Sequence, residues 1–195
     1  MKNVTMIMFR EPMLDAKGDQ LLTYNRREYF LKCGYHINEV YVDNSIRSVV
    51  RNLHLVLYNY FIKKQPLQCA IFNEFFEKTI KGFPGEPHIL YVNNIRSLNV
   101  LKYFYKSDKK FCFELIDSMS LNVLRLCSSK NFFFRFFYKN EAKRLRLLER
   151  KIVEEYPFVS VVSAIDAKHI GNFPNLKVHR LGVNESKILK NFKTN

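Results

Sequence analysis

FREPMLDAKGDQLLTYN (residues 9–25) is the segment where the first predicted strand gives way to the first predicted helix. The apolar run of residues 4–9 indicates a buried strand, and apolar side chains at helical spacing follow over residues 19–33. Asp19 can cap that helix, and Gly18 stands directly before it. A strand that leads at once into a helix is the first step of an alternation that continues along the chain.

Strand and helix signals alternate over the rest of the sequence. Further strands are predicted at residues 37–42, 88–92, 110–117, 158–163 and 176–181, and further helices at 45–63, 67–79, 98–105, 132–155 and 166–170. Parallel neighbouring strands need crossover connections, which helices supply, and apolar strands without strict alternation indicate burial on both faces. The sequence therefore predicts an α/β protein with a Rossmann-like parallel sheet of six or seven strands and helices on both faces.

The composition is typical of a globular protein rather than a disordered or membrane-spanning one. Its 195 residues suit a single domain, with 47% hydrophobic and 26% charged residues. No apolar run reaches the roughly 18 residues of a spanning helix, and Glu11 and Pro12 come too early for a secretory signal. The four cysteines indicate packed, reduced thiols in the cytoplasm, because none stands in a CxxC pair or beside a His cluster.

The positive charge of the chain is concentrated in one segment. The formal net charge is +14, and residues 125–151 hold nine Lys or Arg and two Glu, which is half of that excess. The same segment contains NFFFRFFYK, with five of the 18 phenylalanines. Such a charge indicates an anionic partner, which can be nucleic acid, a membrane surface or a phosphorylated substrate.

Gly18 stands at the first of the strand ends where ligands bind in folds of this kind. Free N–H groups and the helix dipole at a helix N-terminus attract anions, and Arg10 and Lys17 flank this turn. The other glycines of a GxGxxG motif are missing, which disfavours dinucleotide binding. Gly18 is therefore either an anion contact or a plain turn residue.

Two carboxylates belong to the strand predicted at residues 110–117. Asp117 ends that strand, where it either faces the crevice and accepts bonds from sugar hydroxyls or caps the next helix together with Ser118 or Ser120. Glu114 lies within the strand, where a buried carboxylate needs a Lys or Arg partner unless it reaches an edge. No Ser/His/Asp or Cys/His nucleophile arrangement is recognisable, and the five histidines are interpreted as packed or exposed side chains.

Several segments follow one another in the order known from one enzyme family. They are Arg10-Glu11-Pro12, Lys17-Gly18-Asp19, Tyr24-Asn25, QPLQCAIF (65–72), FELIDSMS (113–120), residues 141–170 and LGVN (181–184). Together they resemble the N-terminal domain of GT-B glycosyltransferases, most closely the family-four retaining enzymes that build capsules, lipopolysaccharide and exopolysaccharide. Leu22 stands where that family commonly has Arg, and Arg180-Leu181 replaces its usual Pro-Asn.

The resemblance implies a glycosyltransferase that moves a sugar from a nucleotide-sugar co-substrate to a saccharide or lipid-linked acceptor in surface polysaccharide biosynthesis. Gly18, Asp19, Arg10 and Lys17 are then expected to bind substrate at the donor diphosphate. Asp117 is expected to be catalytic, beside the reacting sugar or the acceptor hydroxyl. No cofactor is implied, and no metal, because no Asp-x-Asp stands at a strand end.

The resemblance also implies a domain organisation. Residues 1–184 correspond to the acceptor-side, Rossmann-like half of a GT-B fold, and residues 185–195 to the start of a linker or tail. In that family the donor-binding half comes after this point. The chain as given is therefore expected to be inactive without a donor-binding domain, whether that domain was truncated or is supplied by another chain.

The Phe-rich basic segment has two interpretations. It is either a helix start that packs in the core or an interfacial helix on anionic lipid at the inner face of the membrane. The second is favoured, because consecutive phenylalanines span more than one helical face. Its expected membrane-binding residues are Phe133, Phe137, Arg135 and Lys139. The alternatives to a transferase are a basic nucleic-acid-binding module, which no recognised motif supports, and a non-catalytic scaffold domain.

Overall fold

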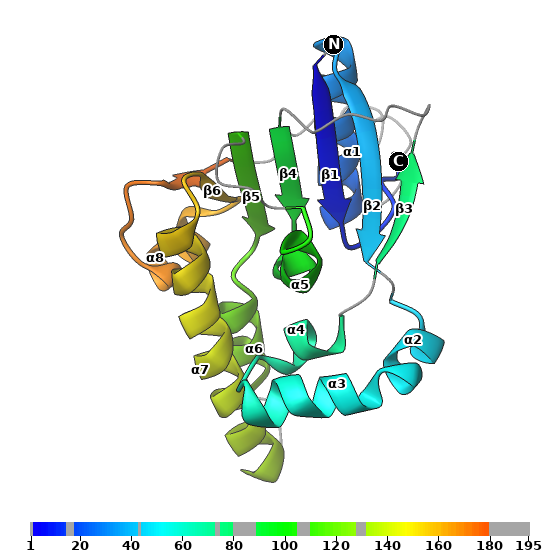
Figure 1. The fold of residues 1–195 in the computed structure, drawn as a ribbon. Coiled ribbons are helices and arrows are strands. Elements are labelled where there is room, and N and C mark those ends of the chain that lie inside the picture. The colour runs from blue at the N-terminus through cyan, green and yellow to red at the C-terminus, as the bar shows by residue number, and fades with distance from the viewer. Residues whose placement is uncertain are drawn as a thin grey trace, which may run out of the picture.

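The computed structural model describes residues 2–14, 18–42, 44–72, 75–79, 89–104, 110–127 and 132–179. Its strands form one sheet in the order β3-β2-β1-β4-β5-β6-β7 (Figure 1). They are β1 (Asn3–Met8), β2 (His36–Val42), β3 (Phe75–Thr79), β4 (Ile89–Asn93), β5 (Lys110–Ile116), β6 (Val159–Val161) and β7 (Leu176–Val178). Six strands run parallel, and β3 pairs antiparallel with β2 at one edge. The predicted α/β, Rossmann-like sheet is confirmed.

Helices cover both faces of this sheet. They are α1 (Asp19–Lys32), α2 (Ile46–Arg51), α3 (Leu53–Leu57), the π-helical turn η1 (Tyr58–Ile62), α4 (Leu67–Ile71), the 3-10 turn η2 (Ile95–Ser97), α5 (Leu98–Leu101), α6 (Met119–Cys127), α7 (Phe132–Glu155) and α8 (Ala164–Ile170). Side chains of α1 pack on one face, and side chains of α4 to α8 pack on the other.

Strand β1 shows why both faces are covered. Its side chains point alternately to the two sides of the sheet. Val4, Met6 and Met8 pack into the cluster that includes Phe30 of α1. Ile7 packs into the larger cluster on the opposite face. All of these β1 side chains are fully buried, so the strand lies at the centre of the molecule.

Two buried carboxylates connect the sheet to α1. Glu114 of β5 accepts a hydrogen bond from Arg26, with 3.0 Å between Nη2 and Oε1, and another from the Tyr91 hydroxyl. Glu39 of β2 accepts from Nε of Arg27 at 2.7 Å. The prediction that Glu114 pairs with a Lys or Arg is therefore confirmed.

The predicted helix over residues 67–79 is wrong in its second half. Helix α4 ends at Ile71, and Phe75–Thr79 forms the edge strand β3. The stretch FFEKT combines aromatic and β-branched residues, which favour a strand once a partner edge is present. Its partner is β2, which comes more than thirty residues earlier in the chain. Local apolar spacing contains no information about such a pairing.

The predicted helix over residues 45–63 forms as α2, α3 and η1, but its expected inner face is wrong. The apolar spacing predicts an inner face of Val49, Leu53, Val56, Leu57 and Tyr60, and of these five only Val56 is buried. Leu53 and Leu57 are about half exposed. By contrast, the helix predicted at residues 132–155 matches α7. The LGVN segment, the 184/185 domain boundary and the tail lie outside the described residues.

The strand order creates a crevice at the carboxyl ends of β1 and β4. Chain connections from β1 lead to β2 on one side, whereas the later parallel strands follow β4 on the other. Ligands of open α/β sheets bind at such a point, because the crossovers diverge there. Figure 1 shows the carboxyl ends of these strands at the bottom, on the same side as α2, α3, α4 and the N-terminal end of α7.

Candidate functional site

Arg10 and Arg96, which follow two neighbouring strands, both make cation–π contacts with the ring of Phe9 in this crevice. Phe9 and Arg10 follow β1, and Arg96 lies in η2 after β4. The guanidinium carbon of Arg96 is 4.6 Å from the Phe9 ring centroid, and that of Arg10 is 5.4 Å away. Burial lowers the pKa of Arg96, and the like charge of Arg10 lowers it further. Nε of Arg96 donates to Oε1 of Gln68 at 2.8 Å, which holds it in place.

Gly18 sits beside these arginines as the N-cap of α1. Its φ of 68° and ψ of −127° lie where residues with a Cβ are strained, so the backbone alone requires glycine there. The predicted cap at Asp19 is wrong, because Asp19 is the first residue inside the helix. Its carboxylate lies 3.7 Å from Nη1 of Arg10. A Cβ on Gly18 would meet no atom within 4 Å, so the turn opens on free space.

Asp117 follows a strained turn at the end of β5. Ile116 has a φ of 69°, which is an outlier for a β-branched residue. The N–H of Asp117 donates to the carbonyl of Leu115 at 3.0 Å, closing a γ-turn where the register with β6 shifts. Backbone strain of this kind concentrates at functional sites.

The carboxylate of Asp117 does not cap α6. The N–H of Leu121 donates instead to the hydroxyl of Ser118 at 3.2 Å. Oδ2 of Asp117 accepts from the Asn122 amide at 2.6 Å. Of the two interpretations of Asp117, the cap therefore belongs to Ser118, and Asp117 keeps a half-exposed carboxylate at the crevice.

Asn94 is a second backbone outlier, at the neighbouring end of β4. It has a φ of 73° and a ψ of 141°, and its side-chain oxygen accepts from the N–H of Arg96 at 3.1 Å. The chain thus bends sharply after both β4 and β5. The first bend places Arg96 over the sheet edge, and the second turns Asp117 toward the same edge.

These charged groups act on one another as a cluster. The like charge of Arg10 lowers the pKa of Arg96, whereas the carboxylates of Asp19 and Asp117 raise it. Arg10 also lines a pocket of about 420 Å³ at the ends of β1 and β2, together with Phe9, Glu11, Gln20, Tyr41, Val42 and Asn44. We call the cluster of Arg10, Gly18, Asp19, Arg96 and Asp117 the crevice site.

The structure brings together most of the sequence-predicted site residues. Arg10 and Asp19 lie 3.7 Å apart beside Gly18, Asp117 follows β5 at the same carboxyl edge of the sheet, and Lys17 lies outside the described residues. The sequence analysis missed Arg96 and its partner Gln68. The rule that ligands bind at strand ends could have found Arg96, because it stands only a few residues after the strand predicted at 88–92.

A buried polar network lies behind α6, and it was also missed. Glu149 of α7 is fully buried and accepts from the hydroxyls of Ser118 and Ser120, at 3.0 and 2.6 Å, and from the N–H of Ser120. Nε2 of His169 lies 2.9 Å from the Ser120 hydroxyl. Burial raises the pKa of Glu149, although these hydrogen bonds lower it.

This network accepts hydrogen bonds from the first backbone N–H groups of α6 and does not form a site with an activated nucleophile. In a hydrolytic triad the acid orients the histidine, and the histidine accepts the serine proton. Here the acid accepts directly from the serine and from the first N–H groups of α6. Glu149 is therefore a helix cap supplied from another helix, which ties α7 to α6.

The crevice site can bind an anion. It offers two guanidinium groups and the N-terminus of a 14-residue helix, with Asp117 at its border. Over the described ranges, no three His, Cys, Asp or Glu residues gather as they would around a metal ion. Comparisons of the chain with protein-family models, with curated proteins and with solved structures find no match in any of the three. What the chain does must therefore be inferred from its own residues.

Proposed function

We propose that this chain is the acceptor-side domain of a retaining glycosyltransferase of surface polysaccharide biosynthesis. The observation that carries the proposal is the pair Arg10 and Arg96 on Phe9, in front of the N-terminus of α1. A nucleotide-sugar has a diphosphate, which is the anion such a site fits. The acceptor is a saccharide or a lipid-linked saccharide, as the family resemblance implies.

The residues of the crevice site suit the charges that develop during sugar transfer. Transfer with retention builds positive charge at the anomeric carbon and negative charge on the leaving diphosphate. Arg10 and Arg96 would stabilise the leaving group, and the open turn at Gly18 would let it approach the backbone. Asp117, oriented by Asn122, would accept a hydrogen bond from a hydroxyl of the reacting sugar or of the acceptor.

The start of α7 supports the proposed contact with a membrane. Phe132 and Phe136 are 80% and 75% exposed, and Arg135 and Lys139 are exposed beside them. Phe137 is at the border of exposure at 37%, and the side chain of Phe133 lies outside the described part of the chain. Exposed phenylalanine among basic residues is the composition of an interfacial helix. We propose that α7 holds the protein at an anionic inner membrane face, close to a lipid-linked acceptor.

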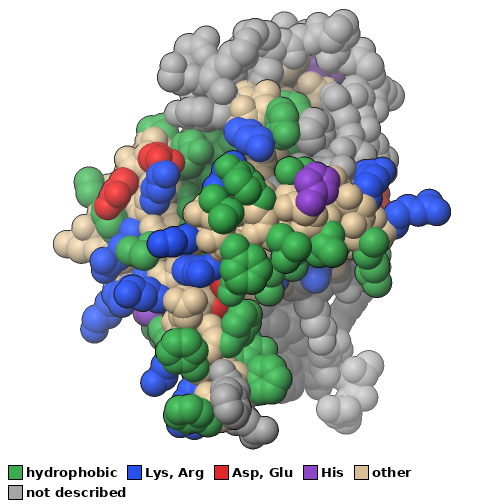
Figure 2. Space-filling view, turned by 60° about the horizontal axis from the view of Figure 1, so that its bottom comes forward, with side chains coloured by type: hydrophobic (Ala, Val, Ile, Leu, Met, Phe, Trp, Pro, Cys, Tyr) green, Lys and Arg blue, Asp and Glu red, His purple; other side chains and the backbone are tan. Residues whose placement is uncertain are grey.

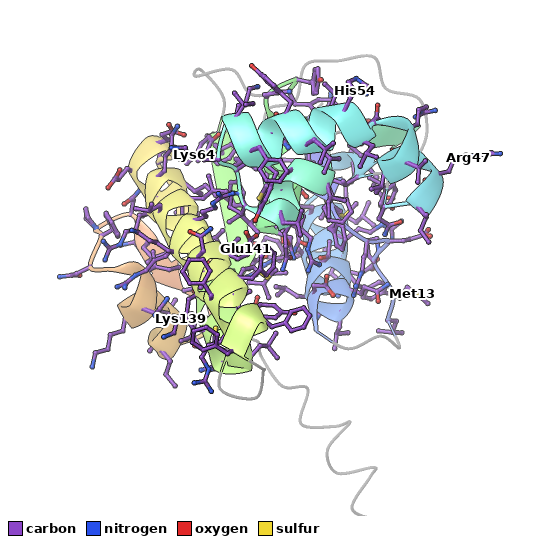
Figure 3. The ribbon with its side chains drawn as sticks, turned by 90° about the horizontal axis from the view of Figure 1, so that it is seen from below. Met13, Arg47, His54, Lys64, Lys139 and Glu141 are labelled. Atoms are coloured by element: carbon purple, nitrogen blue, oxygen red, sulfur yellow. The ribbon has the colours of Figure 1, made fainter. Side chains whose placement is uncertain are left out.

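Calorimetric titration with pyrophosphate and with a nucleoside diphosphate tests the crevice site. Arg10→Gln and Arg96→Gln should each weaken binding about tenfold or more, because each removes charge-assisted hydrogen bonds. Arg47→Gln is the matched control, since Arg47 is an exposed arginine on α2 that points away from the molecule in Figure 3. If the wild type and the three variants all bind pyrophosphate with equal affinity, the crevice site does not bind the diphosphate.

A short oligonucleotide in the same titration separates the transferase from a nucleic-acid-binding module. A diphosphate should bind the crevice site more tightly than single-stranded DNA of equal phosphate content. Preference for the oligonucleotide, with a steep dependence on salt, would support the nucleic-acid interpretation instead.

A further inference from the structure

The α2–η1 segment presents a stripe of apolar side chains to solvent. Its members are Ile46, Val50, Leu53, Leu57 and Phe61, which follow one another at spacings of four, three, four and four residues. That spacing normally marks the face that a helix buries. Here this face is exposed to solvent instead, because Ile46 is 83% exposed and Phe61 is 63% exposed. We call these five residues the apolar stripe.

The apolar stripe lies on the same side of the molecule as the exposed start of α7. Both elements are at the bottom of Figure 1, beyond the carboxyl ends of the strands. Figure 2 shows hydrophobic side chains over α3 and the N-terminal end of α7, with Lys and Arg side chains beside them. Ile62 and Tyr58 add further exposed apolar area at the end of the stripe. A continuous exposed patch of this kind indicates a surface that another body covers.

A groove that we call the basic groove lies between residues 63–66, α5 and α7, directly after the end of η1. It encloses about 840 Å³. Its cationic lining residues are Lys63, Lys64, Lys102, Lys143, Arg144 and Lys151. The one acidic lining residue is Glu155, whose carboxylate lies 3.4 Å from Lys151. The groove therefore has a strong positive potential and a size that suits a phosphorylated headgroup.

Arg144 joins the groove to the end of the stripe. Its Nη1 donates to the carbonyl of Tyr60 at 3.1 Å, and its guanidinium carbon lies 4.6 Å from the Tyr60 ring centroid. Lys63 lies 5.3 Å from the ring centroid of Tyr58. The positive groove and the apolar side chains of η1 are thus held against one another, as they would be at a lipid headgroup boundary.

We propose that the apolar stripe and the basic groove form, with the start of α7, one docking face for an anionic lipid bilayer. The apolar stripe would enter the boundary between headgroups and acyl chains, and the groove would take a lipid phosphate headgroup. The inference rests on the membrane contact proposed for α7 and not on transferase activity.

Charge complementarity selects this occupant over two others. A second copy of a chain with a net charge of +14 would bring two basic grooves together, which is unfavourable. A nucleic acid would satisfy the groove but leave the apolar stripe in water. Only an anionic lipid surface has both a negative layer and an apolar one. Along the described residues no helix has the length and apolar composition needed to cross a bilayer.

Vesicle sedimentation tests the docking face. The wild-type chain should bind vesicles of phosphatidylglycerol and phosphatidylcholine, bind pure phosphatidylcholine far less, and lose binding as salt rises. Val50→Ser/Phe61→Ser should lower partitioning about tenfold or more. Lys64→Gly/Lys143→Gln should lower it about twenty-five-fold at low salt, since each basic residue near such a surface contributes about fivefold. Lys64 has a φ of 53°, so glycine removes its charge without backbone strain.

Matched controls change exposed residues on other helices. Tyr29→Ser/Ile165→Ser removes apolar side chains from α1 and α8, and Lys32→Gln/Lys168→Gln removes two charges from the same helices. Both controls should bind vesicles like the wild type. Circular dichroism and thermal unfolding should show all variants folded, because every altered side chain is exposed.

Three results would overturn the inference. The first is unchanged vesicle binding in the stripe and groove variants. The second is equal loss of binding in the controls. The third is self-association of the wild type in solution that the stripe variant abolishes, seen by light scattering, which would assign the stripe to a second copy. If the first result is seen and Phe132→Ser/Phe136→Ser abolishes vesicle binding, only the start of α7 contacts the membrane and the larger docking face is refuted.

Discussion

At the scale of single residues, the crevice site is built from backbone conformations that most residues avoid. Gly18 and Asn94 have positive φ values at the start of α1 and the end of β4, and Ile116 has one at the end of β5. Strain of this kind persists only where the surrounding structure enforces it. Of the described non-glycine residues with a positive φ, Asn94 and Ile116 lie at this edge of the sheet and Lys64 lies elsewhere, so two neighbouring strand ends share this feature.

Gly18→Ala tests whether the turn is more than a backbone requirement. Gly34 is its control, because it also has a positive φ and open space around it but lies at the other end of α1. Both alanine variants should lose about 1–3 kcal/mol of unfolding free energy in urea. Only Gly18→Ala should also weaken pyrophosphate binding, because its Cβ would stand in the path of the ligand. Equal binding by the two variants would make Gly18 a plain turn residue.

Glu149→Gln tests the buried cap of α6 through pH. Burial raises the folded-state pKa of Glu149 above its unfolded value, so the native state binds the proton more tightly. The stabilisation from this proton is fully present below the unfolded pKa and is lost as pH rises through the folded pKa. The wild type should therefore gain unfolding free energy relative to Glu149→Gln as pH falls from 7 toward 4. Urea unfolding at several pH values measures this, and a difference that moves in the opposite direction contradicts it.

At the scale of elements, α1 is attached to the sheet by charge as well as by packing. Its side chains Arg26 and Arg27 reach buried carboxylates on two different strands. The pKa of Arg26 is raised by its hydrogen bond to Glu114, although burial opposes that change. A helix held in this way keeps its N-terminus fixed over the crevice site.

Removing Arg26 should cost more than removing the whole pair. Among the described residues, Arg26→Met leaves the buried Glu114 with Tyr91 as its remaining side-chain hydrogen-bond partner, so we expect a loss of about 2–4 kcal/mol in unfolding free energy. Arg26→Met combined with Glu114→Gln should recover part of that loss, because no unpaired charge remains. Chemical unfolding of the three proteins gives the comparison, and additive losses in the double variant would argue against a coupled pair.

At the scale of the whole molecule, two basic regions lie on one side of the sheet and are proposed to bind different anions. The crevice site holds Arg10 and Arg96 at the strand ends, and the basic groove lies between residues 63–66, α5 and α7. Half of the net charge of +14 falls within residues 125–151, and Figure 2 shows Lys and Arg side chains beside the hydrophobic side chains of this face. This arrangement would place a soluble donor and a lipid-linked acceptor close to each other.

Variants in the two regions should separate the two kinds of binding. Lys143→Gln with Lys151→Gln should weaken vesicle binding and leave the affinity for pyrophosphate within about twofold of the wild type. Arg96→Gln should weaken pyrophosphate binding and leave vesicle binding unchanged. Sedimentation with anionic vesicles and calorimetry on the same protein preparations measure both. Parallel loss of both activities in either variant would show that the regions act as one site.

The sequence by itself determined the fold class and the most regular elements. Alternating strands and helices require a parallel sheet with crossovers, whatever the detailed packing. The limits of α7 follow from its spacing and from Pro157, which cannot continue a helix. The exposure of phenylalanine at the start of α7 follows from helical geometry alone, since consecutive residues cannot share one face. Local signals were sufficient for each of these.

Only the tertiary structure decided which distant residues meet and which faces stay uncovered. Residues 75–79 form a strand because the edge of β2 is free to pair with them. The apolar stripe has the spacing of a buried face, yet no described element covers it. Arg96 joins Arg10 because β1 and β4 are neighbours in the sheet. Spacing within a segment measures local preference, whereas pairing, burial and charge clustering depend on contacts between segments far apart in the chain.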